Sequence, residues 1–182
     1  MNTAVDNIWR EYVSVCDLFT KQGEVSALVD YTNTMRKVII LSCGSHFEYE
    51  MTKMLKEYVL EVSNGNAQIA SFLERQAIRQ RYHTLFDWGK QDDPAQPGTS
   101  AKNFLRLFGD EFQSRVDGII KSQPEIKDAL HAFLELGHLR NILVHSNFAD
   151  YAYAEKTPED IYALYQKACM FIPFISGKLR EK

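Results

Sequence analysis

The chain has 182 residues, of which 45% are hydrophobic and 25% are charged, and its formal net charge is −3. These values are typical of one globular domain with its own core, and they argue against nonspecific coating of nucleic acid, which needs a basic surface. Any nucleic-acid contact should therefore depend on a local basic patch. Since no apolar run reaches the ~18 residues of a membrane span and no leader-like segment opens the chain, we expect one cytoplasmic domain over residues 1–182.

Apolar residues recur at helical spacing along the first third of the chain. A stripe over residues 8–19 predicts a first helix. Gln22-Gly23 either breaks this helix or only loosens it, because one glycine costs a helix about 1 kcal/mol. Residues 35–62 hold no proline and continue the stripe, which predicts a long second helix. The polar segment 63–66 then predicts a turn.

The rest of the chain continues the helical pattern, with one clear interruption. Residues 92–100 contain two prolines and a glycine, which indicates a loop. Further helices are predicted over residues 67–86, 101–108 and 110–122, from Pro124 to about residue 143, and from Thr157 onward. No segment alternates with the period of a strand. We therefore predict an all-α bundle of four to five main helices plus short helices.

Arg140 and His145 stand out in an otherwise apolar helical stretch. Arginine is permanently cationic and its paired donors fit a phosphate, while histidine titrates nearest to neutral pH. A side chain that binds phosphate, next to one that transfers protons, is the smallest set of groups that can cleave RNA without a metal. Asn141 lies one turn before His145 on the same helix face. The alternative is a surface arginine and a helix-end histidine that merely complements the helix dipole.

The angle between Arg140 and His145 on an ideal helix is about 140°, so their side chains do not stack. They converge only through the reach of the arginine, a loosened last turn, or a second subunit that brings its own copy.

The three histidines at positions 131, 138 and 145 suggest a metal site, but their spacing argues against it. Residues seven apart on a helix are about 10 Å apart along its axis, and one ion cannot bind such a set unaided. We therefore expect no metal and no cofactor. His131 and His138 are interpreted as residues that line a helix face, such as an interface.

The Arg-Asn-x3-His element of residues 140–145 resembles the signature of HEPN domains. It ends a helix after Glu135-Leu136-Gly137 and is followed by Ser146-Asn147-Phe148. Residues 41–48 and 102–109 resemble two further segments of the branch called RiboL-PSP-HEPN, and the likeness runs from about residue 30 to the C-terminus. HEPN domains are helical bundles, and many are ribonucleases that need no metal. The resemblance therefore implies both this fold and this activity.

The resemblance also implies a homodimer in which two Arg-x4-His motifs meet across a cleft. His145 would act as general base on the ribose 2′-hydroxyl or as acid to the leaving oxygen, and Arg140 would stabilise the phosphorane. Asn141 would orient the imidazole or donate to phosphate. Glu48, in the middle of the long second helix, is a further candidate. Its carboxylate is either buried with a cationic partner, for which Arg140 is an obvious candidate, or exposed at the cleft. Proteins of this kind usually serve as toxins or phage-defence effectors, restrained by an antitoxin or a regulatory protein.

RNA contacts need positive charge and aromatic stacking. The candidate substrate-binding residues are His46, Arg79, Lys102, Asn103 and Tyr151. Arg79 belongs to the densest basic cluster, residues 75–83, in which Tyr82 is able to stack on a base. The alternative is that this cluster is a solvated helix face. We expect the long loop over residues 88–100 to be mobile and to border the same cleft.

Two other functions remain open from the sequence. One is a catalytically silent HEPN-like dimerisation module that binds a nucleotide or a protein, which the net charge of −3 favours. The other is a purely structural dimerisation domain, in which Arg140 and His145 could both be replaced without consequence.

Overall fold

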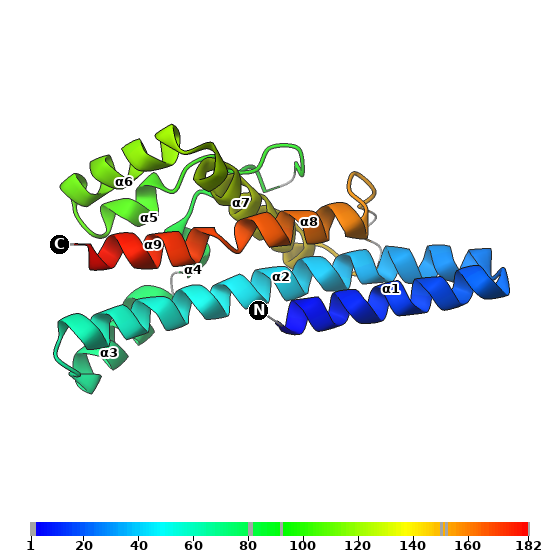
Figure 1. Ribbon diagram of the computed structural model, residues 1–182, viewed down its shortest axis with the longest axis horizontal. Helices are drawn as coiled ribbons and strands as arrows, with labels where there is room; N and C mark the ends of the chain where they lie inside the picture. Colours follow the sequence, from blue (N-terminus) through cyan, green and yellow to red (C-terminus); the bar gives the residue numbers. More distant parts are fainter. Residues whose placement is uncertain (1–2, 80–81, 92, 150, 152, 182) are drawn as a thin grey trace.

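The computed structural model describes residues 3–79, 82–91, 93–149, 151 and 153–181, and this part of the chain is an α-helical bundle. The elements in chain order are α1 (Ala4–Gln22), α2 (Val25–Val62), α3 (Ala67–Leu73), the π-helix η1 (Glu74–Arg79), α4 (Tyr82–Leu85), α5 (Lys102–Arg106), α6 (Asp110–Ser122), α7 (Pro124–His145), α8 (Pro158–Ala168) and α9 (Phe171–Arg180). Helices α1 and α2 form a long antiparallel hairpin, α8 and α9 run along α2, and α7 crosses behind them (Figure 1). The all-α prediction is confirmed.

Local signals at both ends define α1. Its first turn is a capping box, in which the Thr3 hydroxyl accepts from the Asp6 N–H and the Asp6 carboxylate accepts from the Thr3 N–H. At the other end Gly23 adopts a left-handed φ of 73°, so the glycine ends the helix. The next helix, α2, starts at Val25 and runs for 38 residues, which makes it longer than the sequence predicted. Neither α2 nor any other described helix is apolar enough over sufficient length to cross a membrane.

Two predicted single helices are interrupted, so these predictions are wrong in detail. The region after Ala67 changes from α- to π-geometry at Glu74, whose buried carboxylate forms an ion pair with Lys56 of α2 at 2.8 Å. The last helix divides between α8 and α9 because Pro173 lies in the first turn of α9. In a continuous helix the proline ring would clash with the carbonyl of Cys169, and proline has no N–H to donate.

The middle of α7 is fixed in an aromatic core. The ring of Phe133 lies 5.5 Å from that of Phe47 on α2, 5.1 Å from that of Phe86 and 5.0 Å from that of Phe171 on α9, and all four residues are buried. Edge-on and tilted contacts of this kind favour one packing arrangement. They set the position of the last two turns of α7, which carry Arg140 and His145.

Candidate active site

Arg140 lies between α7 and α2 with its side chain held at three points. Its aliphatic stem packs on Gly44, where an added Cβ atom would lie 2.6 Å from the Arg140 Cγ. Nη2 of the guanidinium donates to Glu48 Oε2 at 3.2 Å, and Nη1 donates to Asn141 Oδ1 at 3.1 Å. The side chain remains 28% exposed. The arrangement orients a cation and leaves it open to a ligand.

Aromatic side chains close the inner side of Arg140. A cavity of only about 10 Å³ separates the arginine from Tyr82, Trp88 and Phe133. Burial raises the pKa of the Tyr82 hydroxyl, and Glu48 raises it further while Arg140 lowers it, so the phenol lies within the field of the ion pair. Because Tyr82 is buried, it is not available to stack on a base as the sequence suggested. It instead forms part of the wall behind Arg140.

His145 is the last residue of α7 and is exposed. Among the described residues, no hydrogen bond or ion pair joins its ring to Arg140, Asn141 or Glu48, as the 140° separation predicts. The exposed side chains of Val144 and Phe148 flank it. The three predicted residues that the structure brings together are therefore Arg140, Asn141 and Glu48, and His145 faces solvent nearby on the same helix.

The segment after His145 is fixed against α2. The Lys37 ammonium donates to the Phe148 carbonyl at 2.7 Å and lies 5.2 Å from the centre of the Phe148 ring. Tyr151 is half-buried in this segment, where its N–H donates to the Asn147 carbonyl at 2.9 Å. Tyr151 thus stays close to the end of α7, and within the described chain no hydrogen bond or ring contact joins it to Arg140. Its role in binding substrate stays a prediction.

The remaining basic candidates lie farther from the ion pair. Lys102 and Asn103 are exposed in the first turn of the short helix α5, and within the residues that the structure describes no hydrogen bond links them to Arg140. Arg79 ends η1, and its side chain lies outside the described part of the molecule. Their roles in binding substrate stay predictions.

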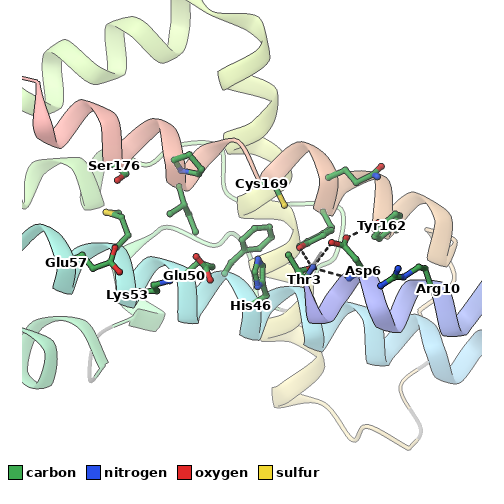
Figure 2. Close-up of a pocket in the computed structure, with 16 residues that line it drawn as sticks. Thr3, Asp6, Arg10, His46, Glu50, Lys53, Glu57, Tyr162, Cys169 and Ser176 are labelled. Atoms are coloured by element: carbon green, nitrogen blue, oxygen red, sulfur yellow. Dashed lines mark hydrogen bonds between the residues drawn. The ribbon is translucent and has the colours of Figure 1, made fainter. Parts of the chain in front are cut away.

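His46 lies on a different face of α2 from Glu48, because two residues along a helix correspond to about 200° of rotation. Its ring is 5.6 Å from that of Tyr165 and lines a cavity between α1, α2, α8 and α9 (Figure 2). Burial lowers the pKa of its imidazole, although Glu50 and Asp6 partly oppose the shift. The structure does not bring His46 together with Arg140.

The long loop after α4 borders the motif, as the sequence predicted. It is a closed turn in which Gly89 and Pro97 form an isolated antiparallel bridge. Trp88, at its base, packs on Gly137 of α7 so closely that an added Cβ atom would lie 2.1 Å from the tryptophan Cζ3. The indole N–H donates to the His83 carbonyl at 2.9 Å. These contacts hold the loop next to the turn of α7 that precedes Arg140.

His138 also holds this loop. Its ring is buried, and Nε2 lies 2.8 Å from the Asp93 carbonyl oxygen in the middle of the loop. The interpretation of His138 as a residue that lines an interface is therefore wrong, because its face is covered by the chain itself. Its hydrogen bond secures the loop at a position two residues before Arg140 on α7.

Sequence reasoning missed the two glycines that make the site possible. Gly44 leaves room for the stem of Arg140, and Gly137 leaves room for the ring of Trp88. The signal was present, since glycine in a helix interior is unfavourable and often marks a close approach of another group. Which group approaches is a property of the tertiary structure.

Comparison with known families finds one whose model spans most of the chain. The family model described as RiboL-PSP-HEPN matches residues 7–181, a span that includes Glu48 and the whole of α7. Neither the curated proteins nor the solved structures compared with the chain gave a match. The matched span covers nearly the whole chain and includes the Arg-Asn-x3-His element at the end of α7. The chain belongs to the RiboL-PSP-HEPN family.

Proposed function

We propose that this protein is an endoribonuclease that cleaves RNA without a metal, with the Arg-x4-His motif at a homodimer cleft. HEPN domains generally cleave RNA or bind nucleotides. The observation that carries the proposal is the state of Arg140, a partly exposed guanidinium oriented by Glu48 and Asn141 with an exposed His145 on the same helix. An oriented arginine matches a phosphate with paired donors, and a solvent-facing imidazole transfers protons near neutral pH.

The proposed reaction uses the RNA itself as nucleophile. His145 of one subunit removes the proton from the ribose 2′-hydroxyl, and the 2′-oxygen forms a bond to the adjacent phosphorus. The bond from phosphorus to the 5′-oxygen breaks, and the same His145, now an imidazolium, gives this oxygen the proton that it took from the 2′-hydroxyl. Arg140 stabilises the negative charge on the phosphorane. The products are a 2′,3′-cyclic phosphate and a 5′-hydroxyl.

A second copy of the chain supplies what one subunit lacks. Within one helix the 140° angle keeps Arg140 and His145 apart, whereas two antiparallel copies can place the histidine of one subunit near the arginine of the other. Val144 and Phe148 expose apolar surface beside His145. Exposed apolar side chains around a polar motif favour a protein–protein contact there.

Replacing His145 tests the proposal. His145→Ala should lower the rate of RNA cleavage by about 10²- to 10⁴-fold, the usual contribution of a general acid–base group, and should leave the oligomeric state unchanged. His131→Ala, about four turns earlier on α7, is the matched control and should keep full activity. Full activity of His145→Ala, in a preparation free of contaminating nuclease, would contradict the proposal. Inhibition of the wild type by EDTA would indicate a metal enzyme instead.

The alternative is a silent module that binds a nucleotide or a protein partner. It is favoured by the fact that the guanidinium of Arg140 already has two protein partners. Expression of the wild type and of Arg140→Ala in a bacterial host separates the two functions. Slower growth with the wild type alone supports the nuclease and its role as a toxin or defence effector, and equal growth supports the binding module.

A further inference from the structure

A second, larger cavity lies away from Arg140. It has a volume of about 760 Å³ and opens between the start of α1, the middle of α2 and the α8–α9 pair (Figure 2). Its size is within the range of small-molecule sites. None of Arg140, Asn141 and Glu48 lines it. A molecule bound in this cavity would therefore not contact the residues of the proposed nuclease site.

The apolar side chains at the base of this cavity are already buried by the surrounding protein. Phe47, Met54 and Ile172 line it but are only 3%, 6% and 7% exposed. A partner helix that docked here would bury little additional apolar surface and so would gain little from the hydrophobic effect. The surface that a ligand meets combines apolar side chains with charged ones, which favours a small molecule that carries both charged groups and methylene groups.

The charge of the ligand that fits this cavity follows from which of the ionisable side chains are half-buried and which are exposed. Asp6 and Glu50 are half-buried in the cavity, whereas Arg10 and Lys53 are exposed at its rim, where water screens them. Neither Glu50 nor Lys53 has an ion-pair partner in the described part of the chain. The interior of the cavity is therefore negative although its rim is mixed.

Asp6 keeps its negative charge. Burial alone would raise the pKa of its carboxyl, but hydrogen bonds from the Thr3 N–H at 2.8 Å and the Tyr162 hydroxyl at 3.0 Å lower the pKa overall. The groups between Asp6 and Glu50 are neutral near pH 7, because burial lowers the pKa of His46 and raises the pKa of the Cys169 thiol. Both carboxylates, like His46 and Cys169, line the cavity.

We propose that this cavity binds a linear aliphatic polyamine. One ammonium group lies between Asp6 and Glu50, where the two carboxylates favour a cation. The methylene chain follows Met54 along α2. A second ammonium group reaches Glu57, which lies seven residues and about 10.5 Å beyond Glu50 on the same helix. A bare metal ion would not contact the apolar side chains, and it could not bind two carboxylates that lie so far apart along α2.

Calorimetric titration of the intact protein with spermidine tests the proposal. The wild type should bind with one site per chain, and Glu50→Gln, an isosteric change at a residue without an ion-pair partner, should weaken binding about tenfold. Glu61→Gln is the matched control, since Glu61 is on α2, carries the same charge and pairs with Arg180 outside the cavity. The emission of Trp9, which stacks on Tyr162 at 4.4 Å, gives a second readout.

The outcomes separate this site from the nuclease. His145→Ala should bind spermidine like the wild type, so loss of RNA cleavage and loss of polyamine binding are distinguishable. Absence of binding to the wild type would overturn the proposal. Equal weakening by Glu50→Gln and Glu61→Gln would also overturn it, because spermidine would then be responding to surface charge in general.

Discussion

The geometry around Arg140 depends on a residue with no side chain. Gly44 sits in a regular turn of α2, where alanine would be the better helix former by about 1 kcal/mol. Alanine there would place its Cβ 2.6 Å from Cγ and 2.9 Å from Cβ of Arg140. We predict that Gly44→Ala displaces Arg140 and lowers RNA cleavage at least about tenfold, while the thermal midpoint changes little because helix propensity and the clash oppose each other.

Gly118 of α6 is the control for this substitution, because an added Cβ atom would contact nothing within 4 Å. Gly118→Ala should keep full cleavage and raise the free energy of unfolding by up to about 1 kcal/mol. Unaltered cleavage by Gly44→Ala would show that the stem of Arg140 need not stay where the structure has it.

His46 makes stability depend on pH with a defined sign. Burial lowers its pKa below the ordinary value of 6.5, against the smaller opposing effects of Glu50 and Asp6. Above pH 6.5 the imidazole is mostly neutral in both the folded and the unfolded protein, so its protonation does not lower the free energy of unfolding. As the pH falls below this value, the unfolded chain takes up the proton first, so stability is lost.

We therefore predict that the free energy of unfolding falls more for the wild type than for His46→Gln between about pH 7.5 and pH 5. Urea denaturation at each pH measures both proteins, and the carboxylates contribute to both curves alike. Parallel curves would mean that His46 titrates in the folded protein as it does in the unfolded chain.

At the scale of elements, the loop of residues 88–98 and helix α7 are joined through Gly137. An alanine Cβ at this position would lie 2.1 Å from Cζ3 and 2.4 Å from Cε3 of Trp88, whose indole is held by the His83 carbonyl. We predict that Gly137→Ala costs about 1–3 kcal/mol in the free energy of unfolding, as overpacking generally does. RNA cleavage should also fall, because the loop adjoins the turn that precedes Arg140.

Gly177→Ala on α9, where an added Cβ has open space, serves as the control for Gly137→Ala in the same urea titration. The predicted coupling between loop and motif fails if Gly137→Ala is as stable as Gly177→Ala. It also fails if cleavage survives a measured loss of stability.

At the scale of the whole molecule, the proposed mechanism requires two chains. If each site takes Arg140 from one subunit and His145 from the other, a heterodimer of Arg140→Ala and His145→Ala subunits retains one intact site. The two homodimers retain none. We predict that the purified heterodimer, prepared by co-expression with two different affinity tags, cleaves RNA at least about 10²-fold faster than either homodimer. An inactive heterodimer would place both groups of a site in one subunit, and monomers in sedimentation would exclude the shared cleft altogether.

The sequence by itself determined most of the helices and the contiguous part of the site. The capping pattern at Thr157, the turn over residues 63–66 and the span of α6 follow from interactions within a few residues, so periodicity, turn and capping rules predict them. Arg140, Asn141 and His145 lie within two turns of one helix, and their relative angles follow from helix geometry. The ion pair of Glu48 with Arg140 is one of the two alternatives that the sequence left for this carboxylate, because a glutamate among apolar residues favours a cationic partner.

Only the tertiary structure decided which groups meet across long separations in the chain. Gly44 lies under Arg140, Tyr82 is buried behind it, and His46 faces a separate cavity, although it is only two residues from Glu48. The change to π-geometry at Glu74 likewise depends on what surrounds the helix, whereas the break before α9 follows from the proline at position 173. Local rules act over three or four residues, whereas these contacts depend on how whole helices pack, and packing is set by the fit of many side chains at once.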